Sequence, residues 1–165
     1  MKVIITGDTH IPGRGSKLPS RLLDACNDAD IIIHTGDWCS PEVYETLTTL
    51  AEVKGVYGNV DGEEMRALVP AQQLINIGGL RIGVVHGHGD KKTTEQRAVE
   101  AFADEPVDAI VFGHSHIPVI KYFKGMLLMN PGSPTDKRKL PFYSFITMEI
   151  GDEIHSELIL FRDKS

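Results

Sequence analysis

The sequence has little cysteine and no long apolar segment, and each shortage excludes a class of protein. The two cysteines, Cys26 and Cys39, form no CxxC pair and cannot make a disulfide framework, which favours a reducing compartment. No apolar run approaches the roughly 20 residues that a membrane-spanning helix needs. Asp8 interrupts the N-terminus before the apolar region of a signal peptide can form. We therefore expect a cytoplasmic protein that makes no membrane contact.

Basic residues are also few. Against 23 aspartates and glutamates stand 17 lysines and arginines, which leaves a net charge of −6 and no run of four basic residues. Stable binding to duplex nucleic acid needs a positively charged surface, so we do not expect it. A small phosphorylated substrate is compatible with this composition. A chain of 165 residues buries about 68–70% of its surface, so we predict one domain over residues 1–165 that folds without a metal.

The apolar pattern changes half-way along the chain. In the first half, β-branched strands alternate with helices, one of which begins at Ser40-Pro41-Glu42. The second half is dominated by hairpins, including one with a turn at Gly78-Gly79. Strands are predicted at 3–6, 31–36, 53–57, 74–77, 80–85, 109–112, 119–123, 126–129, 142–150 and 154–161, and helices at 18–29, from 40 and at 93–104. We therefore predict an α/β fold of the α+β type, a four-layer αββα sandwich of two mixed sheets flanked by helices.

Five of the predicted strands are followed by a short motif that combines glycine with side chains able to bind a metal. The motifs are Gly7-Asp8-Thr9-His10, Gly36-Asp37, Gly58-Asn59-Val60-Asp61, His86-Gly87-His88 and Gly113-His114-Ser115-His116. Ligands of α/β sheets bind outside the carboxyl ends of the strands, so these motifs should converge. A set of nitrogen and oxygen ligands without thiolate suits Mn²⁺, Fe²⁺, Ni²⁺ or Zn²⁺. Six or seven ligands suit two ions that share a carboxylate, for which Asp37 is our candidate.

In this order the motifs resemble those of the calcineurin-like metallophosphoesterases, and most of all their small bacterial and archaeal phosphodiesterases. The resemblance runs from about Asp8 to Ser133 and includes Asn130-Pro131-Gly132-Ser133. It implies two divalent ions, with Mn²⁺ expected first, and hydrolysis of phosphate diesters by a water molecule that bridges the ions. By this resemblance, one ion is held by Asp8, His10, Asp37 and His116, and the other by Asp37, Asn59, His86 and His114.

The third motif departs from the family pattern. Many family members have a histidine after the asparagine, where it is thought to assist the leaving group, but this chain has Val60. Asp61 keeps the acidic residue of the motif, and His88 lies two residues after the proposed ligand His86. We name Asp61 and His88 as candidate catalytic residues, with His88 as a phosphate contact or general acid.

Other polar residues have simpler interpretations. We expect His34, inside an apolar strand, to be a hydrogen-bonded core residue and His155 to be solvated. Trp38 and Cys39 follow the proposed ligand Asp37 and either line the substrate cleft or, as we favour, only pack in the protein interior. We do not expect Cys39 to be a nucleophile. Five basic residues in predicted loops could attract a phosphate group, but we favour the simpler interpretation that they are only solvated. They are Arg14, Lys17, Lys137, Arg138 and Lys139.

Two other functions stay open. A phosphomonoesterase would use the same metal motifs. A non-catalytic interaction module is the other alternative, because the family includes a retromer subunit that acts mainly through protein contacts. Since every ligand position is filled in this chain, we favour catalysis. A homo-oligomer is also compatible with the sequence.

Overall fold

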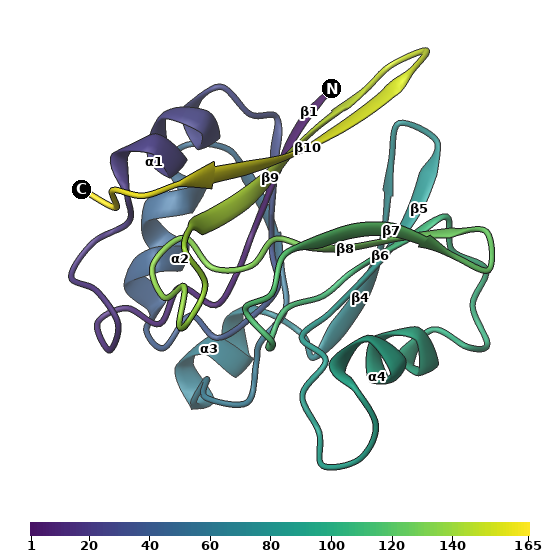
Figure 1. Cartoon of the computed structure of the whole chain (residues 1–165), viewed down its shortest axis with the longest axis horizontal. Coiled ribbons are helices and arrows are strands. Elements are labelled where there is room, and N and C mark those ends of the chain that lie inside the picture. Colours follow the sequence, from purple (N-terminus) through teal and green to yellow (C-terminus); the bar gives the residue numbers. More distant parts are fainter.

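Two mixed β-sheets form the centre of the computed structural model, which describes all 165 residues (Figure 1). The first sheet has the strand order β10-β9-β1-β2-β3 and the second has the order β4-β5-β6-β8-β7. The strands are β1 (Lys2–Thr6), β2 (Ile31–His34), β3 (Glu52–Gly55), β4 (Gln72–Ile77), β5 (Leu80–Val85), β6 (Ala109–Val111), β7 (Val119–Phe123), β8 (Met126–Asn130), β9 (Tyr143–Ile150) and β10 (Ile154–Phe161). In each sheet three neighbouring strands run parallel, and antiparallel strands complete it.

The layers follow from the alternation of side chains along the strands. In β1, Val3 and Ile5 join a cluster of 15 buried residues that fills the space between the two sheets. Ile4, on the other face, packs in a cluster of 13 buried residues with helices α1 (Ser20–Asn27) and α2 (Pro41–Thr48). A third cluster lies between the second sheet and helix α4 (Thr94–Ala101). The predicted sandwich of two sheets between outer helices is confirmed.

Local sequence explains several element ends. Helix α2 begins with Pro41 at its first position, as predicted. Helix α4 begins with a capping box, in which the Thr93 hydroxyl accepts from the Gln96 backbone N–H and the Gln96 side chain accepts from that of Thr93. The β4–β5 hairpin turns through Gly78 and Gly79, both with positive φ. Such φ values suit a two-residue turn and explain why glycine stands at both positions.

The main difference from prediction is helix α3 (Glu63–Leu68), which the sequence pattern did not reveal. It is six residues long and buries only Met65, so it has no apolar face that recurs over several turns. Helices α1 and α4 are also shorter than the predicted 18–29 and 93–104. No helix in the structure has both the length and the apolar character required to cross a bilayer.

Candidate metal centre

The five motifs converge at the carboxyl ends of β1, β2, β3, β5 and β6, as predicted. Their side chains form two groups, and within each group the ligand atoms all lie within 4.8 Å of one another. The first group is Asp8, His10 and His116, and the second is Asp37, His86 and His114. Because the two groups come from both sheets, only the packing of one sheet on the other brings them together.

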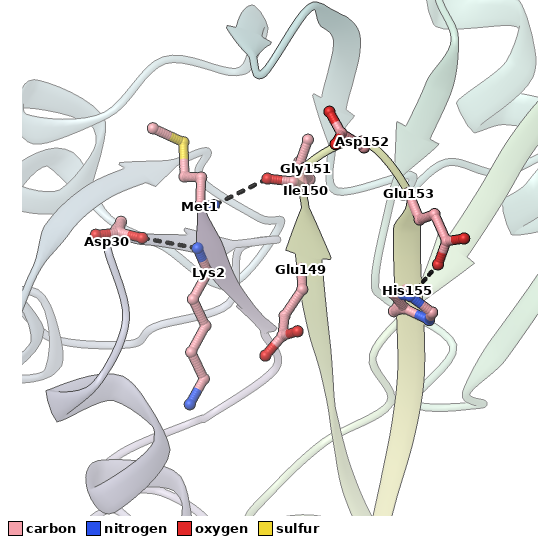
Figure 2. Close-up of a pocket in the computed structure, with 9 residues that line it drawn as sticks. All are labelled: Met1, Lys2, Asp30, Glu149, Ile150, Gly151, Asp152, Glu153 and His155. Atoms are coloured by element: carbon pink, nitrogen blue, oxygen red, sulfur yellow. Dashed lines mark hydrogen bonds and ion pairs between the residues drawn. The ribbon is translucent and has the colours of Figure 1, made fainter.

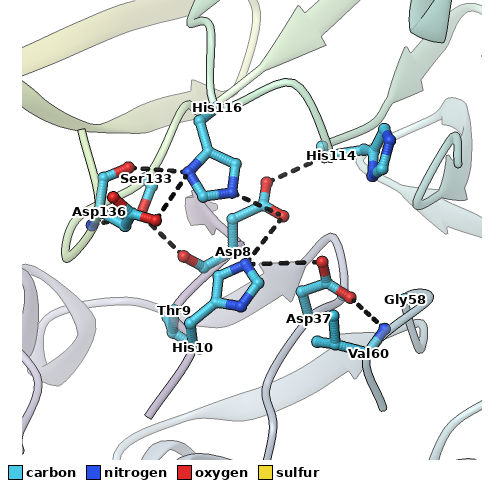
Figure 3. Close-up of polar contacts among 12 residues, drawn as sticks. Asp8, Thr9, His10, Asp37, Gly58, Val60, His114, His116, Ser133 and Asp136 are labelled. Atoms are coloured by element: carbon cyan, nitrogen blue, oxygen red, sulfur yellow. Dashed lines mark hydrogen bonds and ion pairs between the residues drawn. The ribbon is translucent and has the colours of Figure 1, made fainter. Parts of the chain in front are cut away.

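The carboxylates of Asp37 and Asp8 each approach both groups, and Asp37 is the closer to His86, at 3.2 Å against 3.9 Å for Asp8. Oδ2 of Asp37 lies 3.5 Å from Nε2 of His10 in the first group and 3.2 Å from Nε2 of His86 in the second. Asp8, in turn, places Oδ1 3.6 Å from Nε2 of His116 and 3.9 Å from Nε2 of His10, an arrangement visible in Figure 3. Oδ2 of Asp37 therefore lies between the two groups.

Asn59 completes the second group. Its Oδ1 lies 3.1 Å from Nε2 of His86 and 3.2 Å from Nδ1 of His114. An amide oxygen between two ring nitrogens is a neutral donor of the kind that divalent ions accept beside histidine. All seven residues predicted to bind metal are thus within one cluster.

Three buried atoms of the cluster lack any hydrogen-bond partner. They are Oδ1 of Asp8, Nε2 of His10 and Nε2 of His116. Buried polar atoms are nearly always paired, and these three converge on one space in the first group. A divalent cation would supply the missing partner for all three atoms, and their nitrogen and oxygen chemistry suits such an ion. The residues present therefore fit the metals that the fold implies.

Backbone carbonyls hold two of the histidine rings with Nε2 toward the carboxylates. Nδ1 of His86 donates to the Thr35 carbonyl at 2.8 Å, and Nδ1 of His116 donates to the Asp136 carbonyl at 2.8 Å. A carbonyl can only accept, so Nδ1 carries a proton, and in the neutral ring Nε2 presents a lone pair. Figure 3 shows the His116 ring held in this way between Asp136 and Asp8. This is the usual arrangement behind a metal-binding histidine.

The histidines of the cluster differ in their electrostatics. Burial acts to lower the pKa of His86, but the hydrogen bond to Asp37 and the charges of Asp8 and Asp37 outweigh it and raise that pKa. Burial lowers the pKa of His114 and of His116 to about 4, so both rings are free to bind a cation near neutral pH. Burial also raises the pKa of Asp8 to about 7, an effect that a nearby cation would reverse. Burial acts in the same direction on Asp37, but the hydrogen bond and charge of His86 outweigh it and lower the Asp37 pKa to about 2.

Five of the seven candidate ligands have left-handed backbone conformations, which non-glycine residues rarely adopt. The residues are Asp8, His10, Asp37, His114 and His116, with φ between 44° and 69°. Each such residue costs on the order of 1–2 kcal/mol. Conformations of this kind gather at functional sites, where the surrounding contacts enforce them. The strain is one more sign that the cluster is built for a task other than folding.

Comparison with known proteins identifies the family. Residues 1–153 match the model of the calcineurin-like phosphoesterase superfamily domain. The chain belongs to this superfamily. It is 36% identical over 164 residues to a probable metallophosphoesterase of Methanothermobacter thermautotrophicus, covering 96% of this chain and 92% of the relative. A probable metallophosphoesterase of Methanocaldococcus jannaschii is 32% identical over 160 residues, covering 96% of this chain and 81% of that protein.

Solved structures show the same architecture as this phosphoesterase. Vps29 of Entamoeba histolytica in complex with Zn²⁺ is similar with a TM-score of 0.76 and 29% identity, covering 97% of this chain and 99% of Vps29. A structure described as a novel archaeal phosphodiesterase has a TM-score of 0.77 at 22% identity, covering 98% of this chain and all of the other. At that identity the second likeness concerns the fold alone.

The candidate catalytic residues of this phosphoesterase differ in where they lie. The Asp61 carboxylate is 3% exposed and accepts hydrogen bonds from three backbone N–H groups, so it faces the backbone rather than the ligand cluster. Val60 is 47% exposed beside the cluster, and its N–H donates to Oδ1 of Asp37 at 3.0 Å. His88 is exposed, with its ring 5.5 Å from that of His86 and 6.4 Å from that of His114. His88 is therefore near enough to the second group to meet a bound substrate.

His34 is a hydrogen-bonded core histidine, as predicted, and it connects two metal motifs. It is fully buried, and its Nδ1 accepts from the Gly36 N–H at 3.1 Å. Its Nε2 therefore carries the proton and donates to Oγ1 of Thr9 at 3.1 Å. The ring stacks on Trp38 with centroids 3.5 Å apart. Trp38 is 0% exposed, which shows that it packs rather than lines a cleft.

Cys39 and His155 are not among the candidate ligands, although Sγ of Cys39 lies 3.6 Å from Nδ1 of His10. Burial raises the pKa of the Cys39 thiol to about 11, which disfavours the thiolate that a nucleophile needs. His155 is exposed and pairs with Glu153 at 3.1 Å, as expected of a solvated residue. It lines a hollow of about 660 Å³ beside Met1 and Lys2, at the opposite end of β1 from the cluster (Figure 2). That hollow contains no predicted metal ligand.

Several residues that hold the cluster in place were missed from the sequence. Oγ of Ser133 donates to the Asp8 carbonyl at 2.7 Å, and Oγ1 of Thr135 donates to the Thr9 carbonyl at 2.6 Å. These contacts join residues more than 120 positions apart in the chain, so no local pattern predicts them. The resemblance of residues 130–133 to a family motif is the one signal that pointed to this segment.

Proposed function

We propose that this chain is a two-metal phosphodiesterase. The observation that carries the proposal is the Asp37 carboxylate, whose Oδ2 approaches His10 of one ligand group and His86 of the other. The unpartnered atoms of Asp8 and His116 support it further. In this proposal one cation is held by Asp8, His10, Asp37 and His116, and the other by Asp37, Asn59, His86 and His114. Mn²⁺ is the proposed ion, with Ni²⁺, Fe²⁺ and Zn²⁺ as alternatives.

Two divalent cations at this site would bind phosphate oxygens and lower the pKa of a nearby water molecule. The chain's own residues set the geometry. The carbonyls of Thr35 and Asp136 hold the His86 and His116 rings with their lone pairs inward. Gly58 leaves room for Asp37, because a Cβ on Gly58 would overlap Oδ1 of that carboxylate.

The leaving group receives little help from the third motif. Val60 is aliphatic and can donate no side-chain proton, whereas a general acid typically contributes 10²–10⁴-fold. His88 is our candidate proton donor or phosphate contact, since its exposed ring lies beside His86 and His114. Asp61 is better suited to positioning, because both of its oxygens already accept from backbone N–H groups.

We infer in addition that the substrate is a small phosphate ester and that the protein acts in the cytoplasm, without stable binding of duplex nucleic acid or membrane. The net charge of −6 and the two free cysteines support this inference. A homo-oligomer stays a prediction, which light scattering on the purified protein would test.

The test is metal-dependent hydrolysis. Protein stripped with chelator should hydrolyse bis(p-nitrophenyl) phosphate only after Mn²⁺, Ni²⁺, Fe²⁺ or Zn²⁺ is restored, and faster than it hydrolyses p-nitrophenyl phosphate. His114→Gln should lower both turnover and metal content, while His155→Gln, which changes an exposed histidine outside the cluster, should change neither. Preference for the monoester would favour a phosphomonoesterase. No hydrolysis with any ion would favour an interaction module, as the similarity to Vps29 suggests.

A further inference from the structure

The loop that follows β8 is fastened to the first ligand group. Within it, Ser133 and Thr135 donate to the carbonyls of Asp8 and Thr9. The carbonyl of Asp136, in the same loop, accepts from Nδ1 of His116 at 2.8 Å. The backbone N–H of Asp136 donates to Oγ of Ser133 at 2.8 Å, so the two residues are also joined within the loop. The backbone of this loop is therefore held at a defined place beside the ligand group.

Arg138 is the cation that this loop presents. Its backbone is left-handed, with φ of 51°, and its N–H donates to Oδ1 of Asp136 at 3.3 Å. The side chain is exposed, and Nη1 reaches the Ser115 carbonyl at 3.4 Å. Ser115 lies between the two proposed ligands His114 and His116, so the guanidinium lies at the rim of the metal centre.

The guanidinium of Arg138 keeps most of its donors free, and it lacks the carboxylate, aromatic ring or set of several acceptors that engages each of the other arginines around the cluster. Arg14 pairs with the Asp136 carboxylate at 3.5 Å. Arg66 lies over the Tyr57 ring and donates to a backbone carbonyl. Arg97 donates to three backbone carbonyls and one threonine hydroxyl. Arg138 has no carboxylate within 4.0 Å, and its one side-chain hydrogen bond is long.

The chemistry of the Arg138 side chain suits an anion at this position. A guanidinium has five N–H donors in a planar fork that matches two oxygens of a phosphate group. An exposed guanidinium without a carboxylate partner, carried by a fastened loop beside the ligand cluster, is suited to bind an anionic part of the substrate.

We propose that Arg138 is a specificity residue that binds a second phosphate group of the substrate, separate from the phosphate that reacts. The reacting phosphodiester has a single negative charge, and the proposed cations already neutralise it. The substrate class is therefore a phosphodiester that also carries a terminal phosphate. This inference rests on the proposed phosphodiesterase function.

The test compares two esters that differ by one phosphate. They are the p-nitrophenyl ester of thymidine 5′-phosphate and the same ester with an additional 3′-phosphate. For the wild-type protein, KM should be lower for the ester with the second phosphate. Arg138→Gln should reduce that advantage about tenfold, because it removes a charge-assisted contact, and Arg138→Lys should restore part of it. The matched control Lys139→Gln removes an exposed neighbouring charge and should keep the full advantage.

A binding measurement keeps this proposal separate from the proposed function. Calorimetry on the Mn²⁺-loaded protein should give tighter binding of thymidine 3′,5′-bisphosphate than of thymidine 5′-phosphate, and Arg138→Gln should remove the difference. Binding of this kind without hydrolysis of either ester would refute the phosphodiesterase but support the Arg138 subsite. The subsite is refuted if Arg138→Gln weakens both ligands equally, if it changes neither, or if Lys139→Gln has the same effect.

Discussion

Replacement of Asp61 by asparagine distinguishes a catalytic carboxylate from a positioning one. Oδ2 of Asp61 accepts from the N–H groups of Asp37 at 2.9 Å and Gly58 at 2.8 Å. Oδ1 accepts from the N–H of Cys39 at 2.8 Å. This carboxylate thus joins the loop that follows β2 to the loop that follows β3, and these loops carry Asp37 and Asn59. Its substitution should disturb folding as well as metal binding.

The cost of Asp61→Asn can be worked from these three bonds. The asparagine oxygen can still accept from the backbone N–H groups of Asp37 and Gly58, but it no longer carries a charge. The asparagine NH₂ then faces the Cys39 N–H, which loses its acceptor. A partly buried donor that loses its partner costs about 1–3 kcal/mol, and two charge-assisted bonds become neutral at a loss of about 1 kcal/mol each. We expect the free energy of unfolding to fall by about 3–5 kcal/mol.

The assay is urea unfolding in the presence of chelator, so that metal binding does not contribute. Asp61→Asn should unfold at a lower urea concentration than the wild type, and Asp152→Asn, at an exposed turn residue, should not. Calorimetry with Mn²⁺ should show weaker binding to Asp61→Asn. If Asp61→Asn lost turnover while its stability stayed within about 0.5 kcal/mol of the wild type, the positioning role would be refuted and a direct catalytic role favoured.

Three further predictions concern the shared carboxylate, pH and the leaving group. Asp37→Asn should lower metal content and turnover at least about tenfold more than His10→Asn, because Asp37 approaches both ligand groups; two ions per chain with near-normal turnover would contradict this. Burial holds the pKa of His34 well below 6.5, so chelated protein should lose stability as pH falls below 6.5, by at most about 1.4 kcal/mol per pH unit from this residue. In urea unfolding at pH 7 and pH 5.5, His34→Gln should reduce this loss and His155→Gln should not. Val60→His should flatten the dependence of turnover on leaving-group pKa across substituted phenyl diesters, and an unchanged slope would show that the new ring donates no proton.

The sequence by itself determined the layers and the chemistry of the centre. Alternation of apolar residues is a local property, so Val3 to Ile5 and similar runs identify the strands and their two faces. Each metal motif directly follows a strand, and parallel strands end at the same edge of a sheet. These two facts predict which motifs share an edge within each sheet, such as Asp8 with Asp37 and His86 with His116, while the packing of the two sheets brings both edges into one cluster.

Only the tertiary structure decided how the cluster is held and what surrounds it. Helix α3 is too short for a periodic pattern, and the bonds from Ser133 to Asp8 and from His116 to Asp136 join segments that are distant in sequence. The direction of the Asp61 carboxylate and the free guanidinium of Arg138 depend on which backbone groups lie nearby. Residue type states what a side chain can bind, but its partners are set by packing between the two sheets, which no local pattern contains.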